Sequence, residues 1–221
     1  ARGRMPDGAD TYEFFTMPTP GLSNVSGNAT VTTTTLIAPS AQWAYEQSNT
    51  DLGTVWRNRE FDDSSWPRGP GLLYQDNDPI NGPAGTQLEL NPPTTHYFRH
   101  AFTLTGDPLL PAFNFDLFAD DGAVVYLNGI EIYRLRMPNG EITHTTFAAS
   151  GWDNGVREGP FDIPDGLMRP GENVIASSVH QDDGTSGDVV FGLELRSTVT
   201  ETPDQDDGYT QALALLAGLR I

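Results

Sequence analysis

Polar and apolar residues alternate over many short stretches of this chain, and clusters of Gly, Pro, Asn and Asp separate the stretches. Phe113, Phe115 and Leu117 occupy alternate positions, and Asn114 and Asp116 stand between them. A period of two places the three apolar side chains on one face, which is typical of a half-buried strand. Helical periodicity appears only in the last dozen residues.

The same alternation predicts a series of strands along the chain. They are expected at residues 28–37, 95–104, 112–119, 123–127, 130–135, 161–167, 174–180 and 189–196. Asn128-Gly129 is the strongest hairpin signal among the turns. Many short strands without strand–helix alternation predict an all-β fold, either a sandwich or a barrel.

The chain divides by composition into three parts. Residues 1–27 have little periodicity and are expected to be a linker or the stub of an upstream domain. Residues 28–198 carry the strand pattern, and residues 199–221 are an acidic linker followed by an apolar tail. Because Ala1 begins in mid-sequence, we expect the segment to be a fragment of a larger protein with neighbouring domains.

Composition narrows the classes of partner. The chain has 30 acidic residues and 12 basic ones, all of them Arg, and a net charge of −18. This charge argues against nucleic acid and anionic lipid as binding partners. It favours a monomer, because like-charged chains repel each other. It also fits calcium as a ligand, because calcium prefers oxygen ligands such as carboxylates. No apolar run reaches the roughly 18 residues of a membrane span. Without Cys the chain forms no disulfide and no thiolate zinc site.

Three phrases carry a family resemblance: FDDSSW at 61–66, DDGAVVYLNG at 120–129 and GENVIA at 171–176. In this order they resemble the galactose-binding-like jelly roll of β-galactosidases and β-glucuronidases. They also resemble the sandwich modules that follow lamin-tail domains in secreted bacterial proteins, and TPGLSN at 19–24 resembles the end of such a lamin-tail domain. The resemblance covers about residues 40–198. It implies an antiparallel jelly-roll β-sandwich at an extracellular or cell-surface location.

The Asp120-Asp121-Gly122 phrase is the candidate metal site. Two adjacent carboxylates at a strand end repel each other unless a cation neutralises them. The phrase also resembles the Asp-Asp-Gly of protective-antigen-type adhesin domains, where neighbouring Asp residues hold a calcium that touches sugar hydroxyls. A purely structural turn is the alternative that the sequence leaves open. The predicted ligands of calcium are Asp120, Asp121, Asn128, Asp182 and Asp183.

A sugar site needs an aromatic platform or a charged group with hydrogen-bonding neighbours. Each candidate has the alternative of being an ordinary packed or exposed residue. The candidates are Trp152 with Asp153 and Asn154, Tyr74 with Asp76, and Arg134 with Arg136.

Catalytic motifs are scarce in this sequence. It contains no Gly-x-Ser-x-Gly, no His-Glu-x-x-His and no phosphate-binding glycine loop. The lack of Cys and Lys excludes thiol and Schiff-base catalysis. His96 and His100 share a strand face about 13 Å apart, too far for one metal. A glycosidase carboxylate pair stays open, because 30 carboxylates make close pairs inevitable.

The sequence thus favours a non-catalytic carbohydrate-binding module of a larger secreted bacterial protein, with one structural calcium as a further expectation. A structural spacer or protein–protein interaction domain without sugar affinity is the alternative. A third hypothesis is an accessory domain that completes an enzyme's active site in the parent protein. An exposed aromatic beside polar groups in a cleft would favour the binding module over the spacer.

Overall fold

The computed structural model describes residues 2–4, 10, 12–14, 30–76, 79–89, 94–151 and 154–201. Residues 33–198 form one unit, which consists almost entirely of β-strands. The helix described in this unit is the 3-10 turn η1 (Val55–Arg57). In the described part of the chain, no helix has the length and apolar character needed to cross a membrane.

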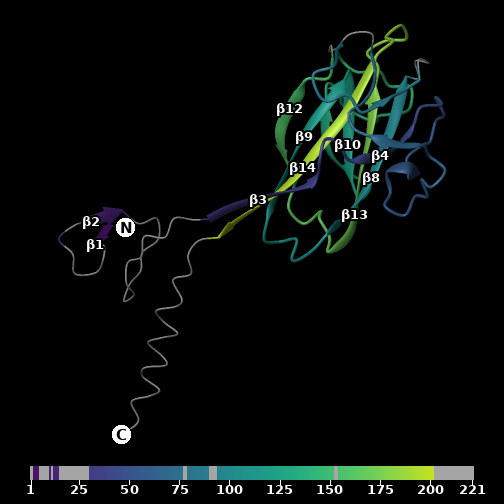
Figure 1. Cartoon of the computed structure of the whole chain (residues 1–221). Helices are drawn as coiled ribbons and strands as arrows, with labels where there is room; N and C mark the ends of the chain where they lie inside the picture. Colours follow the sequence, from purple (N-terminus) through teal and green to yellow (C-terminus); the bar gives the residue numbers. More distant parts are fainter. Residues whose placement is uncertain are drawn as a thin grey trace. The chain divides into compact units, whose positions relative to one another are not determined.

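Two sheets make up this unit, and their strands are stacked as two layers (Figure 1). Within the two strand orders given next, neighbouring strands pair antiparallel, except for the parallel pair of β6 (Leu73–Gln75) with β7 (Thr86–Gln87). The first sheet has the order β11 (Ile130–Leu135), β10 (Gly122–Leu127), β13 (Gly171–His180), β8 (Thr95–Leu104), β4 (Gln42–Glu46) and β5 (Arg68–Pro70). The second has the order β12 (Arg157–Asp162), β9 (Ala112–Asp120), β14 (Val189–Glu201), β6 (Leu73–Gln75) and β7 (Thr86–Gln87), and β3 (Thr30–Ile37) also pairs with β14.

The core lies between the two sheets. Phe98 of β8 stacks on Phe191 of β14 with ring centroids 4.1 Å apart, and Trp43 of β4 meets Phe191 edge-on at 4.9 Å. The alternating residues Phe115 and Leu117 of β9 are fully buried in the same core. The predicted all-β, antiparallel β-sandwich is confirmed, while the jelly-roll connectivity stays a prediction.

Most predicted strands have counterparts in the structure. The predicted strands at 95–104 and 130–135 coincide with β8 and β11. The prediction at 161–167 was shifted, because β12 pairs with β9 from Arg157 onward and ends at Asp162. The sequence missed β5, β6 and β7 because strands of two or three residues are too short to show a period.

Residues 1–32 and 199–221 belong to the second unit. Its described part includes an antiparallel pair of strands, β1 (Arg2–Arg4) and β2 (Tyr12–Phe14), which the sequence did not predict. The apolar tail with helical periodicity lies outside the described residues. The three-part division of the chain stays a prediction.

Candidate functional site

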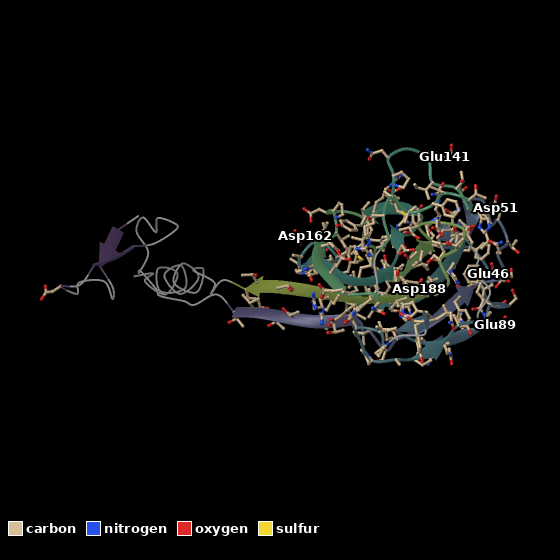
Figure 2. The ribbon with its side chains drawn as sticks, turned by 90° about the horizontal axis from the view of Figure 1, so that it is seen from above. Glu46, Asp51, Glu89, Glu141, Asp162 and Asp188 are labelled. Atoms are coloured by element: carbon tan, nitrogen blue, oxygen red, sulfur yellow. The ribbon has the colours of Figure 1, made fainter. Side chains whose placement is uncertain are left out.

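Three carboxylates meet at one end of the second sheet because of its strand order. Asp120 is the last residue of β9, Asp188 directly precedes β14, and Asp76 directly follows β6. These strands are neighbours in the order β9-β14-β6 and run antiparallel, so the three residues lie at the same end of the sheet. One carboxylate oxygen from each residue lies within 4.8 Å of those of the other two. We call these three residues the Asp cluster; its member Asp188 is labelled in Figure 2.

Asp120 is the most buried member of the Asp cluster, with 0% of its surface exposed. Its Oδ2 accepts a hydrogen bond of 2.7 Å from the backbone N–H of Asn154. Its Oδ1 is buried and has no hydrogen-bond donor among the described residues. Burial, followed by the negative charges of Asp188 and Asp121, raises the pKa of Asp120 to about 8. A cation beside Asp120 would offset both the burial and the repulsion.

Asp121 lies where the chain crosses from the second sheet into the first. Its Oδ2 accepts a 2.8 Å hydrogen bond from the backbone N–H of Asp182, which ties the β9–β10 junction to the loop that follows β13. Arg136 braces the junction by donating to the carbonyl oxygens of Asp121 at 2.8 Å and Ala119 at 2.7 Å. Burial and the charges of Asp121 and Asp183 raise the pKa of Asp182.

An open pocket of about 340 Å³, which we call the acidic hollow, adjoins the Asp cluster. Asp188 belongs to both and receives a 2.9 Å hydrogen bond from the Ser186 hydroxyl. Gly151 closes one side, where an added Cβ would lie 2.5 Å from Oδ2 of Asp182. The residues that line the acidic hollow are Asp121, Gly151, Asp182, Asp183, Thr185, Ser186 and Asp188.

The loop between β13 and β14 owes its shape to Asp183. The Oδ1 atom of Asp183 accepts hydrogen bonds from the Thr185 N–H at 2.6 Å, the Thr185 hydroxyl at 2.7 Å and the Ser186 N–H at 3.0 Å. A carboxylate that accepts several local hydrogen bonds fixes a turn. The same bonds to Thr185 and Ser186 lower the pKa of Asp183, so it stays ionised at the rim of the hollow.

The structure brings four of the five predicted metal ligands together. Asp120 and Asp121 are adjacent, and Asp182 and Asp183 line the hollow with Asp121. Asn128 does not join them, because it lies at the other end of β10, about 20 Å along the strand from Asp121. The Asn128 side chain instead bonds to residues of its own sheet end. Its amide donates to the Asn173 side chain at 2.9 Å and the Leu167 carbonyl at 3.2 Å, and its oxygen accepts the Val174 N–H at 3.0 Å.

Three of the predicted sugar-site residues lie at the site: Asn154 through its bond to Asp120, Arg136 through its bonds to the carbonyl oxygens of Asp121 and Ala119, and Asp76 as a member of the Asp cluster. Trp152 and Asp153 lie outside the described residues. Tyr74 packs in a small apolar cluster on the second sheet, and Arg134 is engaged by Glu131 and the carbonyl of Pro138. A sugar-binding role for these residues stays a prediction.

Asp76 and Asp188 were not among the metal ligands predicted from the sequence. A signal was present, since Asp188 directly precedes the apolar run that begins at Val189, and Asp76 follows the short stretch Leu72–Gln75. Knowing that their three strands are neighbours would have joined them. That neighbourhood depends on pairings between distant parts of the chain, which local patterns do not contain.

No family model and no curated protein matches the chain. Several solved structures are similar to it. A β-glucuronidase from Bacteroides uniformis matches with a TM-score of 0.49 and 16% identity, over 76% of this chain and 18% of its own. A β-glucuronidase from an uncultured Clostridium species matches with a TM-score of 0.48 and 14% identity, over 84% of this chain and 31% of its own. A β-glucuronidase from glycoside hydrolase family 2 matches with a TM-score of 0.47 and 16% identity, over 79% of this chain and 18% of its own.

The chain therefore spans less than a third of the length of these proteins. With TM-scores below 0.5 and identities below 20%, these similarities do not assign a function to the chain.

Proposed function

We propose that residues 33–198 form a non-catalytic glycan-binding module that holds a calcium ion at the Asp cluster and offers it to sugar hydroxyls in the acidic hollow. One observation carries the proposal. Asp120 is fully buried and has an oxygen without a hydrogen-bond donor among the described residues, and carboxylate oxygens of Asp76 and Asp188 lie within 4.8 Å. Three ionised carboxylates held this close repel one another until a proton or a cation neutralises part of their charge, and a cation does so while using all three as ligands.

The ligand type favours calcium. Carboxylate oxygens suit hard cations such as calcium and magnesium, whereas softer metals prefer His and Cys. Oxygens bound to one calcium at about 2.3–2.6 Å lie at most about 5 Å apart, which the Asp cluster satisfies. Calcium takes about 6–8 oxygens, so three carboxylates leave positions for carbonyl oxygens, water or sugar hydroxyls.

The acidic hollow suits a polar ligand such as a sugar. Its size of about 340 Å³ falls in the range of small-molecule sites, and Thr185 and Ser186 supply hydroxyls beside the carboxylates. The chain carries a net charge of −18, which repels anionic ligands. A neutral glycan, with its hydroxyls directed to the cation, therefore matches the hollow better than a uronate or a sulfated sugar.

A glycosidase acid/base pair fits the geometry less well. The raised pKa of Asp120 beside ionised carboxylates is the pattern of such a pair. However, Asp120 is fully buried and does not line the hollow. A cation site is the simpler account of the same charges.

A location outside the cell belongs to the same proposal. Calcium sites of extracellular modules work at about 10⁻⁴–10⁻³ M calcium, so a modest site built from three carboxylates suffices there. The net charge of −18 keeps such a chain soluble in a salty medium, where self-repulsion is screened. A pure spacer would need neither the buried carboxylates nor the hollow.

Affinity gel electrophoresis tests the proposal. The protein is run through gels that contain galactan, mannan, xylan or β-glucan, with millimolar calcium or with EDTA. We expect one polysaccharide to retard the protein in calcium. The retardation should be lost in EDTA and in Asp188→Asn, and it should be kept in the matched control Asp165→Asn. Equal retardation in EDTA would show that polysaccharide binding does not depend on a cation. Retardation by none of the polysaccharides would leave the spacer as the better reading.

A further inference from the structure

The geometry points to Phe147 as the aromatic platform of the acidic hollow, on which the apolar face of a pyranose ring stacks while its hydroxyls reach the cation. This inference rests on the glycan-binding function proposed above and names a specificity-determining residue for it. Phe147 is 41% exposed, although a phenylalanine is ordinarily buried in the core of a sandwich.

Phe147 lies next to the loop that lines the hollow. A Cβ added to Gly184 would have the Phe147 Cζ atom as its nearest neighbour, at 4.0 Å. Gly184 stands between Asp183 and Thr185, which both line the hollow. Because Gly184 has no side chain, nothing from this residue covers the ring.

The backbone on both sides of Phe147 is fixed. The carbonyl oxygen of Thr146 bonds to Nδ1 of His180 at 2.8 Å, and the N–H of Ala148 donates to the carbonyl oxygen of Gln181 at 2.9 Å. Both partners belong to the segment that leads directly into Asp182. Phe147 is thus exposed and yet held against the rim of the hollow. Such a platform loses little conformational freedom when a ligand binds.

The chemistry of the hollow leaves a place for such a platform. The described residues that line it are acids, hydroxyl residues and one glycine, and these recognise only the polar edge of a sugar. Ligand sites generally combine a few placed polar groups with apolar or aromatic contacts. Phe147 supplies an apolar surface beside the loop, so a neutral hexopyranose could use its C–H face and its hydroxyl edge at once.

The test measures two affinities for each variant. The calcium affinity is measured by titration calorimetry. The second affinity is for whichever of galactan, mannan, xylan and β-glucan retards the wild type most. Phe147→Ala should weaken the polysaccharide about tenfold and leave the calcium affinity within about twofold. Phe147→Tyr should restore sugar binding because the ring is kept. Leu109→Ala is the matched control, since Leu109 is 77% exposed and follows β8 at the other end of the sandwich.

The outcomes separate this inference from the function on which it rests. Unchanged polysaccharide affinity in Phe147→Ala, with wild-type binding still dependent on calcium, would overturn the platform and keep the module. Loss of calcium affinity together with sugar affinity would assign Phe147 a structural role and also overturn the platform. No binding of any polysaccharide by the wild type would overturn the glycan-binding function and the platform with it.

Discussion

Asp120 at the end of β9 and Asp188 just before the start of β14 are diagonal neighbours, with carboxylate oxygens no more than 4.8 Å apart. The two residues are distant in sequence and meet because β14 runs antiparallel to β9. The register places Asp120 opposite Val190, two positions after Asp188. The candidate cation site is therefore a product of the strand order and not of a continuous motif.

Asn128 should be structural and should not affect calcium. In Asn128→Gly the positive φ of 52° at this turn remains favourable, but the bonds to Asn173, Leu167 and Val174 are lost. We expect the free energy of unfolding to fall by about 2 kcal/mol, because buried partners are left without hydrogen bonds. Urea denaturation measures the loss, and calorimetry should give the wild-type calcium affinity. A weakened calcium affinity would return Asn128 to the metal site.

Asp63 should contribute far more to stability than its neighbour Asp62. Asp63 accepts a 2.9 Å hydrogen bond from Nε of Arg99, whose side chain is only 2% exposed. In Asp63→Ala the buried guanidinium loses its counter-charge, which costs about 3 kcal/mol. Asp62 is exposed and caps only the Ser64 N–H at 3.0 Å, so Asp62→Ala should cost about 1 kcal/mol or less. Equal losses in urea denaturation would contradict this account of the FDDSSW phrase.

Acid should destabilise the protein through buried histidines. Burial, with a smaller effect from His180, lowers the pKa of His96 to about 3, and burial lowers the pKa of His180 to about 4. Below the ordinary histidine pKa near 6.5 the unfolded chain takes up protons that the folded chain does not, so the free energy of unfolding falls as the pH falls. Each histidine contributes a slope approaching about 1.4 kcal/mol per pH unit.

The variant His96→Leu isolates one of these two histidines. The two ring nitrogens of His96 are buried and have no hydrogen-bond partner among the described residues, so an apolar side chain should be accepted there. The melting temperature of His96→Leu should fall less steeply than that of the wild type between about pH 6.5 and 5. Parallel pH profiles for the two proteins would show that His96 is not buried in its neutral form.

The sequence contained most of the fold and four of the six acids of the Asp cluster and the acidic hollow. Strands such as β8 and β9 were predictable because they are ten and nine residues long, enough for their aromatic and apolar residues to form a recognisable strand pattern. Asp120 and Asp121 were predictable because two adjacent carboxylates at a strand end repel each other unless a cation neutralises them. Asp76 and Asp188 were not, because only the non-local pairing of β6, β14 and β9 joins them.

The case of Asn128 is different, because the sequence alone could have excluded it. Asp121 and Asn128 bracket one predicted strand, and a strand advances about 3.3 Å per residue. Two side chains at its opposite ends are too far apart to bind one ion. The hairpin signal at Asn128-Gly129 was sound, and the structure confirms it with positive φ angles of 52° and 89°.

Calcium titration by isothermal calorimetry tests the central claim most directly. Wild type, Asp120→Asn, Asp188→Asn and the control Asp165→Asn would be titrated after EDTA treatment and dialysis. We predict one calcium per wild-type chain, the same affinity in Asp165→Asn, and a loss of at least about tenfold in the other two variants. The melting temperature should rise with calcium only in the two proteins that bind it. Wild-type protein that takes up no calcium, or Asp120→Asn that binds it as wild type does, would contradict the account.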